Sequence, residues 1–212
     1  MCSGRVDLSF VLRAFSRGID GVFIGGCHLN ECHYITDGNY HALSMVLLCK
    51  KVMQQIGLNP ERLRIEWVSA GEGIRFAEIM NDFSMKLKEL GPLGKGEKLG
   101  EEGLKLKLQA LSKLVPYLRL VEGERLRVHL RSEEAYHRFY ESAEFDRLFK
   151  ELVGDQLAMG QIVLLLGARP LSTGELSGIL DLSPSEVSRH ISNSSRRGLI
   201  RYDVDRKGYT LA

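Results

Sequence analysis

The sequence has 212 residues, enough for one large domain or two small ones. Hydrophobic residues make up 44% and charged residues 26%, which excludes a disordered or fibrous chain. The formal net charge is +2, low for a protein devoted to coating nucleic acid, and four cysteines are too few for a secreted disulfide scaffold. No apolar run approaches the roughly 20 residues that cross a bilayer, and no signal-like segment opens the chain. We therefore expect a cytoplasmic protein without membrane insertion.

Residues 1–92 alternate helix-like and strand-like patterns. A first helix is expected after Asp7, ending at Gly18, with Phe10, Val11, Ala14 and Phe15 on one face. Short apolar runs at 21–26 and 63–69 predict strands, and longer periodic stretches at 39–56 and 72–90 predict helices. Strands that alternate with helices indicate a parallel sheet with helical crossovers. We predict an α/β class with a partial doubly wound parallel sheet of the flavodoxin or Rossmann kind.

Residues 93–154 are predicted to form a linker and a helical connecting region. The stretch Gly91–Gly96 is rich in glycine, as linkers are. The remainder has helical periodicity, with a short strand expected at Leu126–Leu130. The pattern indicates no chemistry in this block.

Residues 155–212 predict a winged helix-turn-helix domain of α+β class. Ser172 with Glu175, and Ser183 with Glu186, have the spacing of two successive capping boxes, each of which starts a helix. Alternating apolar residues from Ile200 onward, followed by a turn and a returning strand, predict a terminal hairpin. Two short helices, a tight turn and a hairpin resemble the small winged-helix domains of bacterial and archaeal regulators.

Cysteines follow the first predicted strand. Cys27 and Cys32 lie in the loop after residue 26, where ligands bind in open parallel sheets. Cysteine thiolates hold iron–sulfur clusters, and a separation of four residues lets two thiols reach one cluster. Cys2 precedes the first helix, so the alternation places it at the same edge. The pattern leaves open a chance pair in a loop and a metal site formed by three converging thiols.

The remaining cysteine and the flanking histidines have several interpretations. Cys49 lies inside an apolar helical stretch, which is typical of a small buried residue. His28 and His33 flank the thiols and either hydrogen-bond to cluster sulfurs, ligate a metal or lie on a loop surface.

Residues 1 to about 92 resemble the delta subunit family of methyl-viologen-reducing hydrogenase. The matching segments are residues 1–7, Gly26-Cys27-His28, Cys32-His33-Tyr34, Gly38-Asn39-Tyr40 and residues 59–70. The resemblance implies an iron–sulfur subunit with one [2Fe–2S] cluster ligated by Cys2, Cys27 and Cys32. It further implies a non-catalytic relay of electrons between a hydrogenase, formate dehydrogenase or flavin oxidoreductase and a heterodisulfide-reductase-like flavoprotein.

The sequence departs from that family pattern at its start. Family members usually begin earlier, with a further strand and cysteine cluster. We expect the true gene product, read from an upstream start, or a separate partner chain to supply that segment and the missing ligand. The intact mass of the native protein tests this expectation. The loop at residues 35–37 is also expected to be one residue longer than usual.

The C-terminal domain has two candidate roles. Basic and polar residues on its second helix are candidate contacts to DNA or a partner: Arg189, His190, Asn193, Arg196 and Arg197. Residues 155–212 contain seven Lys and Arg against six Asp and Glu, little charge for neutralising phosphates. We therefore favour docking within a redox complex. The alternative is a redox-responsive transcription regulator, with the cluster as sensor and the winged helix on DNA.

Overall fold

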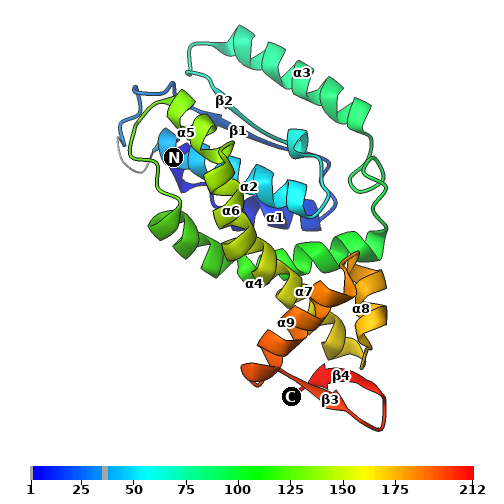
Figure 1. Ribbon diagram of the computed structural model, residues 1–212. Coiled ribbons are helices and arrows are strands. Elements are labelled where there is room, and N and C mark those ends of the chain that lie inside the picture. Colours follow the sequence, from blue (N-terminus) through cyan, green and yellow to red (C-terminus); the bar gives the residue numbers. More distant parts are fainter. Residues whose placement is uncertain (1, 35–37) are drawn as a thin grey trace. The chain divides into compact units, whose positions relative to one another are not determined.

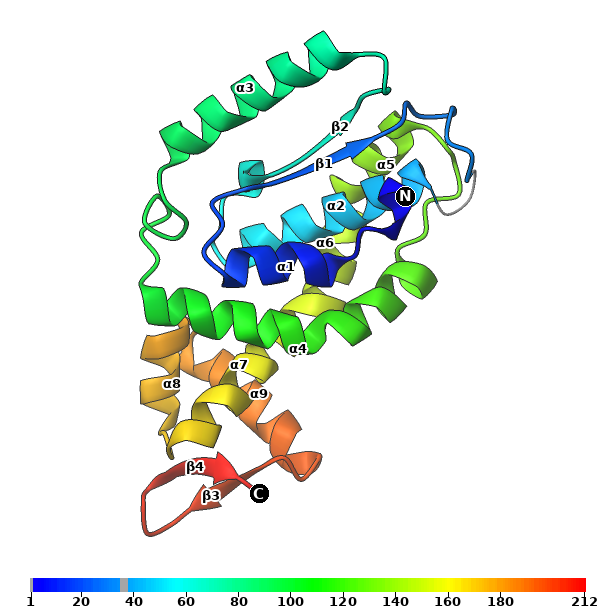
Figure 2. The same cartoon turned by 180° about the vertical axis from the view of Figure 1, so that it is seen from behind.

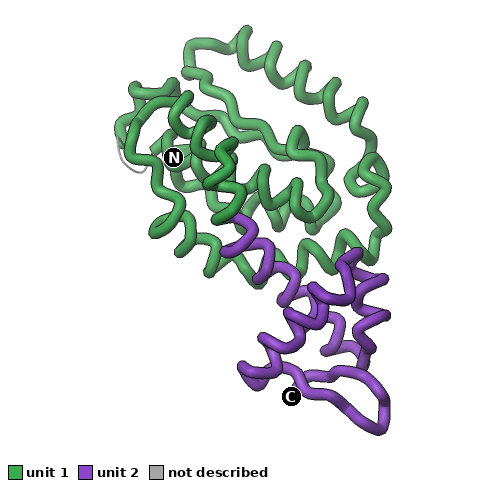
Figure 3. Tube along the Cα trace, in the orientation of Figure 1, with its two compact units in different colours: residues 1–148 green, residues 149–212 purple. Residues whose placement is uncertain are grey.

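The computed structural model describes residues 2–34 and 38–212, so the loop at 35–37 lies outside the described residues. The chain forms two compact units, residues 1–148 and residues 149–212 (Figure 3). The predicted three-block division stays a prediction, and residues 93–148 of its middle block belong to the first unit.

The first unit is built around two parallel strands. Its elements in chain order are η1 (Ser3–Arg5), α1 (Leu8–Ser16), β1 (Val22–Gly26), α2 (Asn39–Gln55), η2 (Pro60–Arg62), β2 (Leu63–Trp67), α3 (Gly73–Leu90), α4 (Glu101–Arg125), α5 (Glu133–Tyr140) and α6 (Ala143–Phe149). β1 and β2 pair in parallel, with Val22 opposite Leu63 and Gly26 opposite Trp67. The predicted parallel sheet with a helical crossover is therefore confirmed.

Helices cover both faces of this sheet. Both views place β1 and β2 between α3 on one side and α1 with α2 on the other, with α4 along α1 (Figures 1 and 2). α2 forms the centre of the core, and Ala42, Val46, Cys49 and Val52 along it are fully buried. The outer helix α3 is much less covered, because Phe83 is its one fully buried residue among those described, while Ile74 is 82% exposed.

The sequence signals for α1 are borne out at both ends. The Asp7 carboxylate caps the helix by accepting the Ser9 backbone N–H at 2.8 Å. Gly18 follows with φ +80°, a conformation that glycine adopts without strain. The predicted inward face is wrong in one member, because Phe10 is 52% exposed. The buried stripe is instead Leu8, Val11, Leu12 and Phe15, and Phe10 lies under the guanidinium of Arg13 at 5.7 Å.

The strand expected at Leu126–Leu130 is also wrong. These residues form an irregular segment between α4 and α5. Among the described residues, no strand pairs with this segment. A strand is stable only when its backbone N–H and C=O groups form hydrogen bonds with a neighbour. Leu126, Val128 and neighbouring residues instead line a pocket of the first unit.

The second unit is a helix-turn-helix followed by an antiparallel hairpin. Its elements are η3 (Lys150–Gly154, a π-helical turn), α7 (Asp155–Ala168), α8 (Thr173–Leu180), α9 (Pro184–Arg196), β3 (Ile200–Asp203) and β4 (Gly208–Leu211). Both predicted capping boxes are present, at Ser172 with Glu175 and at Ser183 with Glu186. The core consists of Ile162, Leu166, Leu171, Leu176, Val187, Ile191 and Ile200.

The helical run from Ala143 to Ala168 is, by length and composition alone, the one described stretch that could cross a membrane. It reaches this length because α6, the π-helical turn and α7 are continuous. Core helices of soluble proteins meet the same criterion, and Ile162 and Leu166 of this run belong to the core of the second unit. The expectation that the chain does not insert into membranes stays a prediction.

Candidate metal centre

Cys27 lies at the carboxyl end of the sheet. It directly follows Gly26, the last residue of β1, which pairs with Trp67 at the end of β2. The loop that it begins is fixed by Asn39, the first residue of α2, whose amide donates to the carbonyl oxygens of Cys27 (3.1 Å) and His28 (2.7 Å). Asn39 is 2% exposed, so both bonds are shielded from water.

Cys2 approaches this loop from the start of the chain. It caps η1, and its Sγ accepts the backbone N–H of Gly4 at 3.4 Å. η1 packs against α2 and β1, and this packing brings the Cys2 Sγ within 3.8 Å of the Cys32 Sγ. Two thiols that are 30 positions apart in the sequence therefore meet at one edge of the sheet.

Cys32 is the most buried thiol of the three and the one best provided with donors. Burial alone would raise its pKa, but backbone N–H groups of Asn39 and Tyr34 and the thiols of Cys27 and Cys2 lower the pKa overall. Burial and the interaction with Cys32 raise the pKa of Cys27. Cys32 is therefore the first of this pair to become a thiolate, the form that binds metals.

Gly38 closes the site from the side of α2. A Cβ built on Gly38 would lie 2.3 Å from the Cys32 Sγ and 2.3 Å from the carbonyl oxygen of Tyr34. No side chain fits at such distances, so glycine allows the helix start to approach the thiol closely. Sequence reasoning assigned no role to Gly38 or Asn39, although both lie in one of the segments that carry the family resemblance.

His28 and His33 have different environments. The His28 Nε2 lies 2.6 Å from Glu72 Oε2, just before α3. The backbone N–H of Ser69 and then the His28 ring lower the pKa of Glu72 to about 2. His33 is exposed and meets the Tyr34 ring edge to face, with centroids 5.2 Å apart. Hydrogen bonding or ligation of a cluster by either histidine stays a prediction.

Cys49 is held apart in the core. It is fully buried in α2, and burial raises the pKa of its thiol to about 12. The interpretation of Cys49 as a small buried residue is confirmed, and the structure does not bring it to the other three thiols.

The three thiols fit the chemistry of an iron–sulfur site in donor type and in one spacing. Two thiolates on one tetrahedral metal with bonds of about 2.3 Å lie roughly 3.8 Å apart, as Cys2 and Cys32 do. Within residues 2–34 and 38–212, however, no three His, Cys, Asp or Glu side chains are arranged to hold a single metal ion. The donor set is suitable but incomplete as a closed site.

The C-terminal candidate residues differ in accessibility. Arg189 pairs with Asp155 at 3.0 Å, and His190 is 5% exposed, in the interior of the second unit. Arg189, Asn193, Arg196 and Arg197 are exposed on or just after α9. Contact of any candidate residue with DNA or a partner stays a prediction, and of the five only His190 is buried.

Residues 1–91 match the family model described as methyl-viologen-reducing hydrogenase, delta subunit. The chain belongs to this family. Residues 159–202 match the model described as bacterial regulatory protein, arsR family.

Named relatives each match less than half of this chain. The iron-sulfur subunit of the F420-non-reducing hydrogenase of Archaeoglobus profundus is 48% identical over 91 residues, covering 43% of this chain and 66% of the relative. The iron-sulfur subunit of the F420-non-reducing hydrogenase vhc of Methanococcus voltae is 46% identical over 101 residues, covering 48% of this chain and 69% of the relative. One subunit of the ferredoxin:CoB-CoM heterodisulfide reductase of Methanosarcina mazei is 46% identical over 94 residues, which are 44% of this chain but 12% of that protein.

Proposed function

We propose that this protein is a cytoplasmic electron-transfer subunit that carries a [2Fe–2S] cluster on Cys2, Cys27 and Cys32. The observation that carries the proposal is the 3.8 Å separation of Cys2 Sγ and Cys32 Sγ, beside Cys27 at the end of β1. The family membership and the names of the relatives support it. Cys49 is buried in α2, so we propose that the fourth ligand is not Cys49 but His28, His33 or a group of a partner chain.

Residues around the thiols stabilise the negatively charged thiolates and fix the position of the loop. Backbone N–H groups of Gly4, Tyr34 and Asn39 donate to sulfur and stabilise the thiolates. The side chain of Asn39 fixes the loop, and His28 bridges it to Glu72 after β2. Single-electron exchange is the chemistry that such a cluster supplies when bound.

The protein is proposed to relay electrons within a larger complex. One partner is a hydrogenase, formate dehydrogenase or flavin oxidoreductase, and the other is a heterodisulfide-reductase-like flavin and iron–sulfur protein. Relatives named as hydrogenase and heterodisulfide reductase subunits support these partners. We assign the sheet to a partial flavodoxin-like fold, and the second unit to a winged helix that docks to the complex.

The cluster assignment is tested on the complex purified anaerobically through a tag on this chain, expressed in its native host. Iron and sulfide are quantified, and electron paramagnetic resonance is recorded on the reduced complex. We expect Cys2→Ser, Cys27→Ser and Cys32→Ser each to remove one two-iron signal. The control Cys49→Ala should retain the signal. Retention of full iron and signal in all three serine variants would refute the ligand assignment.

A second function is favoured by a separate observation, the match of residues 159–202 to the arsR regulatory family. Exposed Asn193, Arg196 and Arg197 supply groups that hydrogen-bond to bases and phosphates. In this alternative the chain is a redox-responsive transcription regulator. Salt-dependent binding to a specific duplex, lost in an Arg196→Gln/Arg197→Gln variant, supports it. Co-purification with flavin and iron–sulfur subunits, without such binding, supports electron transfer.

A further inference from the structure

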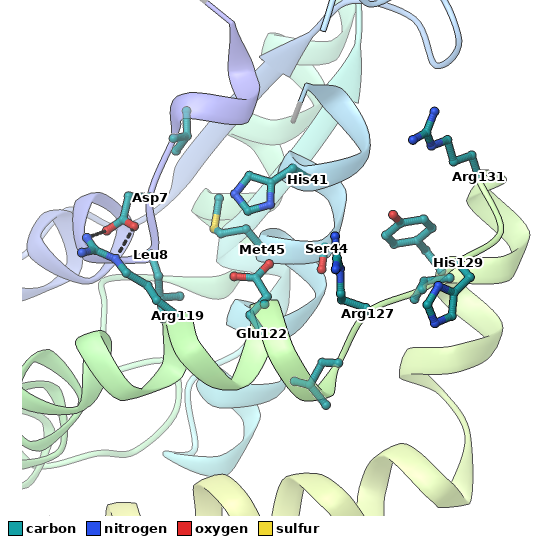
Figure 4. Close-up of a pocket in the computed structure, with 15 residues that line it drawn as sticks. Asp7, Leu8, His41, Ser44, Met45, Arg119, Glu122, Arg127, His129 and Arg131 are labelled. Carbon is teal, nitrogen blue, oxygen red and sulfur yellow. Dashed lines mark hydrogen bonds and ion pairs between the residues drawn. The ribbon is translucent and has the colours of Figure 1, made fainter. Parts of the chain in front are cut away.

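The first unit contains a pocket of about 610 Å³, and no cysteine is among its lining residues. Its walls are α2, α4 and the irregular segment after α4, and it reaches the start of α1 (Figure 4). Small-molecule sites typically have volumes of about 300–1,000 Å³. The family match ends at residue 91, so two of these walls come from the connecting region that lies beyond it.

Basic side chains gather around this pocket. Arg119, Arg127 and Arg131 all line it, together with His41 and His129. Arg119 is already neutralised, because it forms a two-pronged ion pair with Asp7, with N···O distances of 2.7 and 2.6 Å. Arg127 and Arg131 are exposed, and no carboxylate in the described part of the chain forms an ion pair with either. Two guanidinium groups therefore remain available to a ligand.

Two carboxyl groups line the pocket: Asp7, which pairs with Arg119, and Glu122. Figure 4 shows Glu122 extending from α4 toward His41 and Met45 of α2. Its Oε1 is buried without a hydrogen-bond partner among the described residues. Burial raises the pKa of Glu122, against the opposing influence of His41 and Ser44. When protonated, this carboxyl group does not repel an anion and can donate a hydrogen bond to it.

We propose that this pocket binds a small metabolite that carries an oxyanion, either a phosphate or a carboxylate group, through Arg127 and Arg131. Guanidinium groups present paired N–H donors that match the oxygens of both groups. The concave shape favours a small molecule over a nucleic-acid backbone. The site uses none of the thiols, so it stands or fails independently of the proposed electron transfer.

The test measures binding to the full-length protein by isothermal titration calorimetry and by thermal unfolding. One arm uses inorganic phosphate and the other uses succinate, each against sodium chloride at the same ionic strength. We expect saturable binding in at least one arm, and the stronger arm identifies the oxyanion class. Absence of any heat or stabilisation beyond that of sodium chloride in both arms overturns the proposal.

Paired variants locate the site. Arg127→Gln/Arg131→Gln should weaken binding at least tenfold, because both recognition groups are lost. Arg138→Gln/Arg147→Gln removes the same charge from exposed positions of α5 and α6 that do not line the pocket, and should leave affinity within twofold. All four positions are exposed, so folding should be retained, and circular dichroism verifies it. Equal loss in both variants, or no loss in the first, contradicts the assignment.

Discussion

The side chain of Arg62 is completely buried and pairs with Glu97, whose Oε2 lies 3.1 Å from the Arg62 Nη2. The same guanidinium donates to the backbone carbonyls of Asp20, Leu90 and Pro92 at 3.0, 3.3 and 3.4 Å. One side chain beside β2 thus fixes both the segment before β1 and the turn that follows α3.

Breaking this pair should strongly destabilise the first unit. Arg62→Met leaves the Glu97 carboxylate without its counter-charge, and we expect a loss of about 3–5 kcal/mol in the free energy of unfolding. Urea unfolding followed by the fluorescence of Trp67, the single tryptophan, measures it. Glu61→Gln, which removes an exposed pair with Lys86, should cost about 0–1 kcal/mol. Similar losses for both would contradict the structural role of the buried pair.

The Arg62–Glu97 pair also predicts an acid dependence. Burial opposes ionisation of Glu97, but Arg62 and the Asn59 backbone N–H outweigh it and lower the pKa of Glu97. Its stabilising contribution is therefore complete above the ordinary value of 4.5 and is lost as the pH falls below it. Trp67 fluorescence should show urea midpoints that fall between pH 5 and pH 3, by more than in Glu97→Gln. Equal slopes in both proteins would refute this prediction.

Truncation of two phenylalanines on α1 should change the free energy of unfolding by very different amounts. Phe15 is 1% exposed and Phe10 is 52% exposed. Phe15→Ala removes core packing and should cost about 3–5 kcal/mol. Phe10→Ala loses only a surface contact with Arg13, so the change should stay within about 0.5 kcal/mol. The same urea titration measures both, and a large loss in Phe10→Ala would mean that a partner or another segment covers it.

The two capping boxes should each stabilise one helix of the second unit. Ser172→Ala and Ser183→Ala remove the hydroxyls that accept the backbone N–H of Glu175 and Glu186, and each should cost about 1 kcal/mol. Amide hydrogen exchange in the full-length protein should show faster opening of α8 or α9 respectively. Ser192→Ala, at an exposed position inside α9, serves as the control and should change little.

His190 should make the second unit sensitive to mild acid. Burial lowers the pKa of His190 below its ordinary value of 6.5, and the attraction of Asp155 offsets this only in part. The unfolded state then binds the proton more readily, so stability is complete above pH 6.5 and falls as the pH drops below it. Hydrogen exchange of α9 at pH 7.5 and 5.5 should show this loss, and His190→Gln should remove it. An unchanged pH dependence in His190→Gln would contradict the role of this imidazole.

Local signals predicted the elements better than the faces they present. Asp7 and Gly18 mark α1 because capping and left-handed backbone depend on single residues. Phe10 was assigned to the buried face because α1 has hydrophobic residues over a wide arc, and the sequence does not show which part of that arc faces the core. The strand expected at Leu126–Leu130 failed because a strand needs a neighbour, and no local pattern supplies one.

The thiol edge was predictable only in part. The position of Cys27 follows from the rule that ligands bind where parallel strands end. The contact of Cys2 with Cys32 depends on how η1 packs against α2, and the bonds of Asn39 to two carbonyls depend on the path of the loop. The pocket lies partly in the connecting block, where the sequence indicated no chemistry, because isolated arginines carry no spacing signal.

The packing of α2 indicates which shortened forms of the protein should fold. Ser44 on α2 shares a buried hydrogen bond of 2.9 Å with Tyr140, and Tyr40 stacks on Tyr136 with ring centroids 5.5 Å apart. A shortened gene that stopped at codon 92, where the family match ends, would strip these rings from the central helix and yield an aggregating product. A stop near codon 148 keeps the aromatic cover and is the better choice for producing the thiol-bearing part by itself.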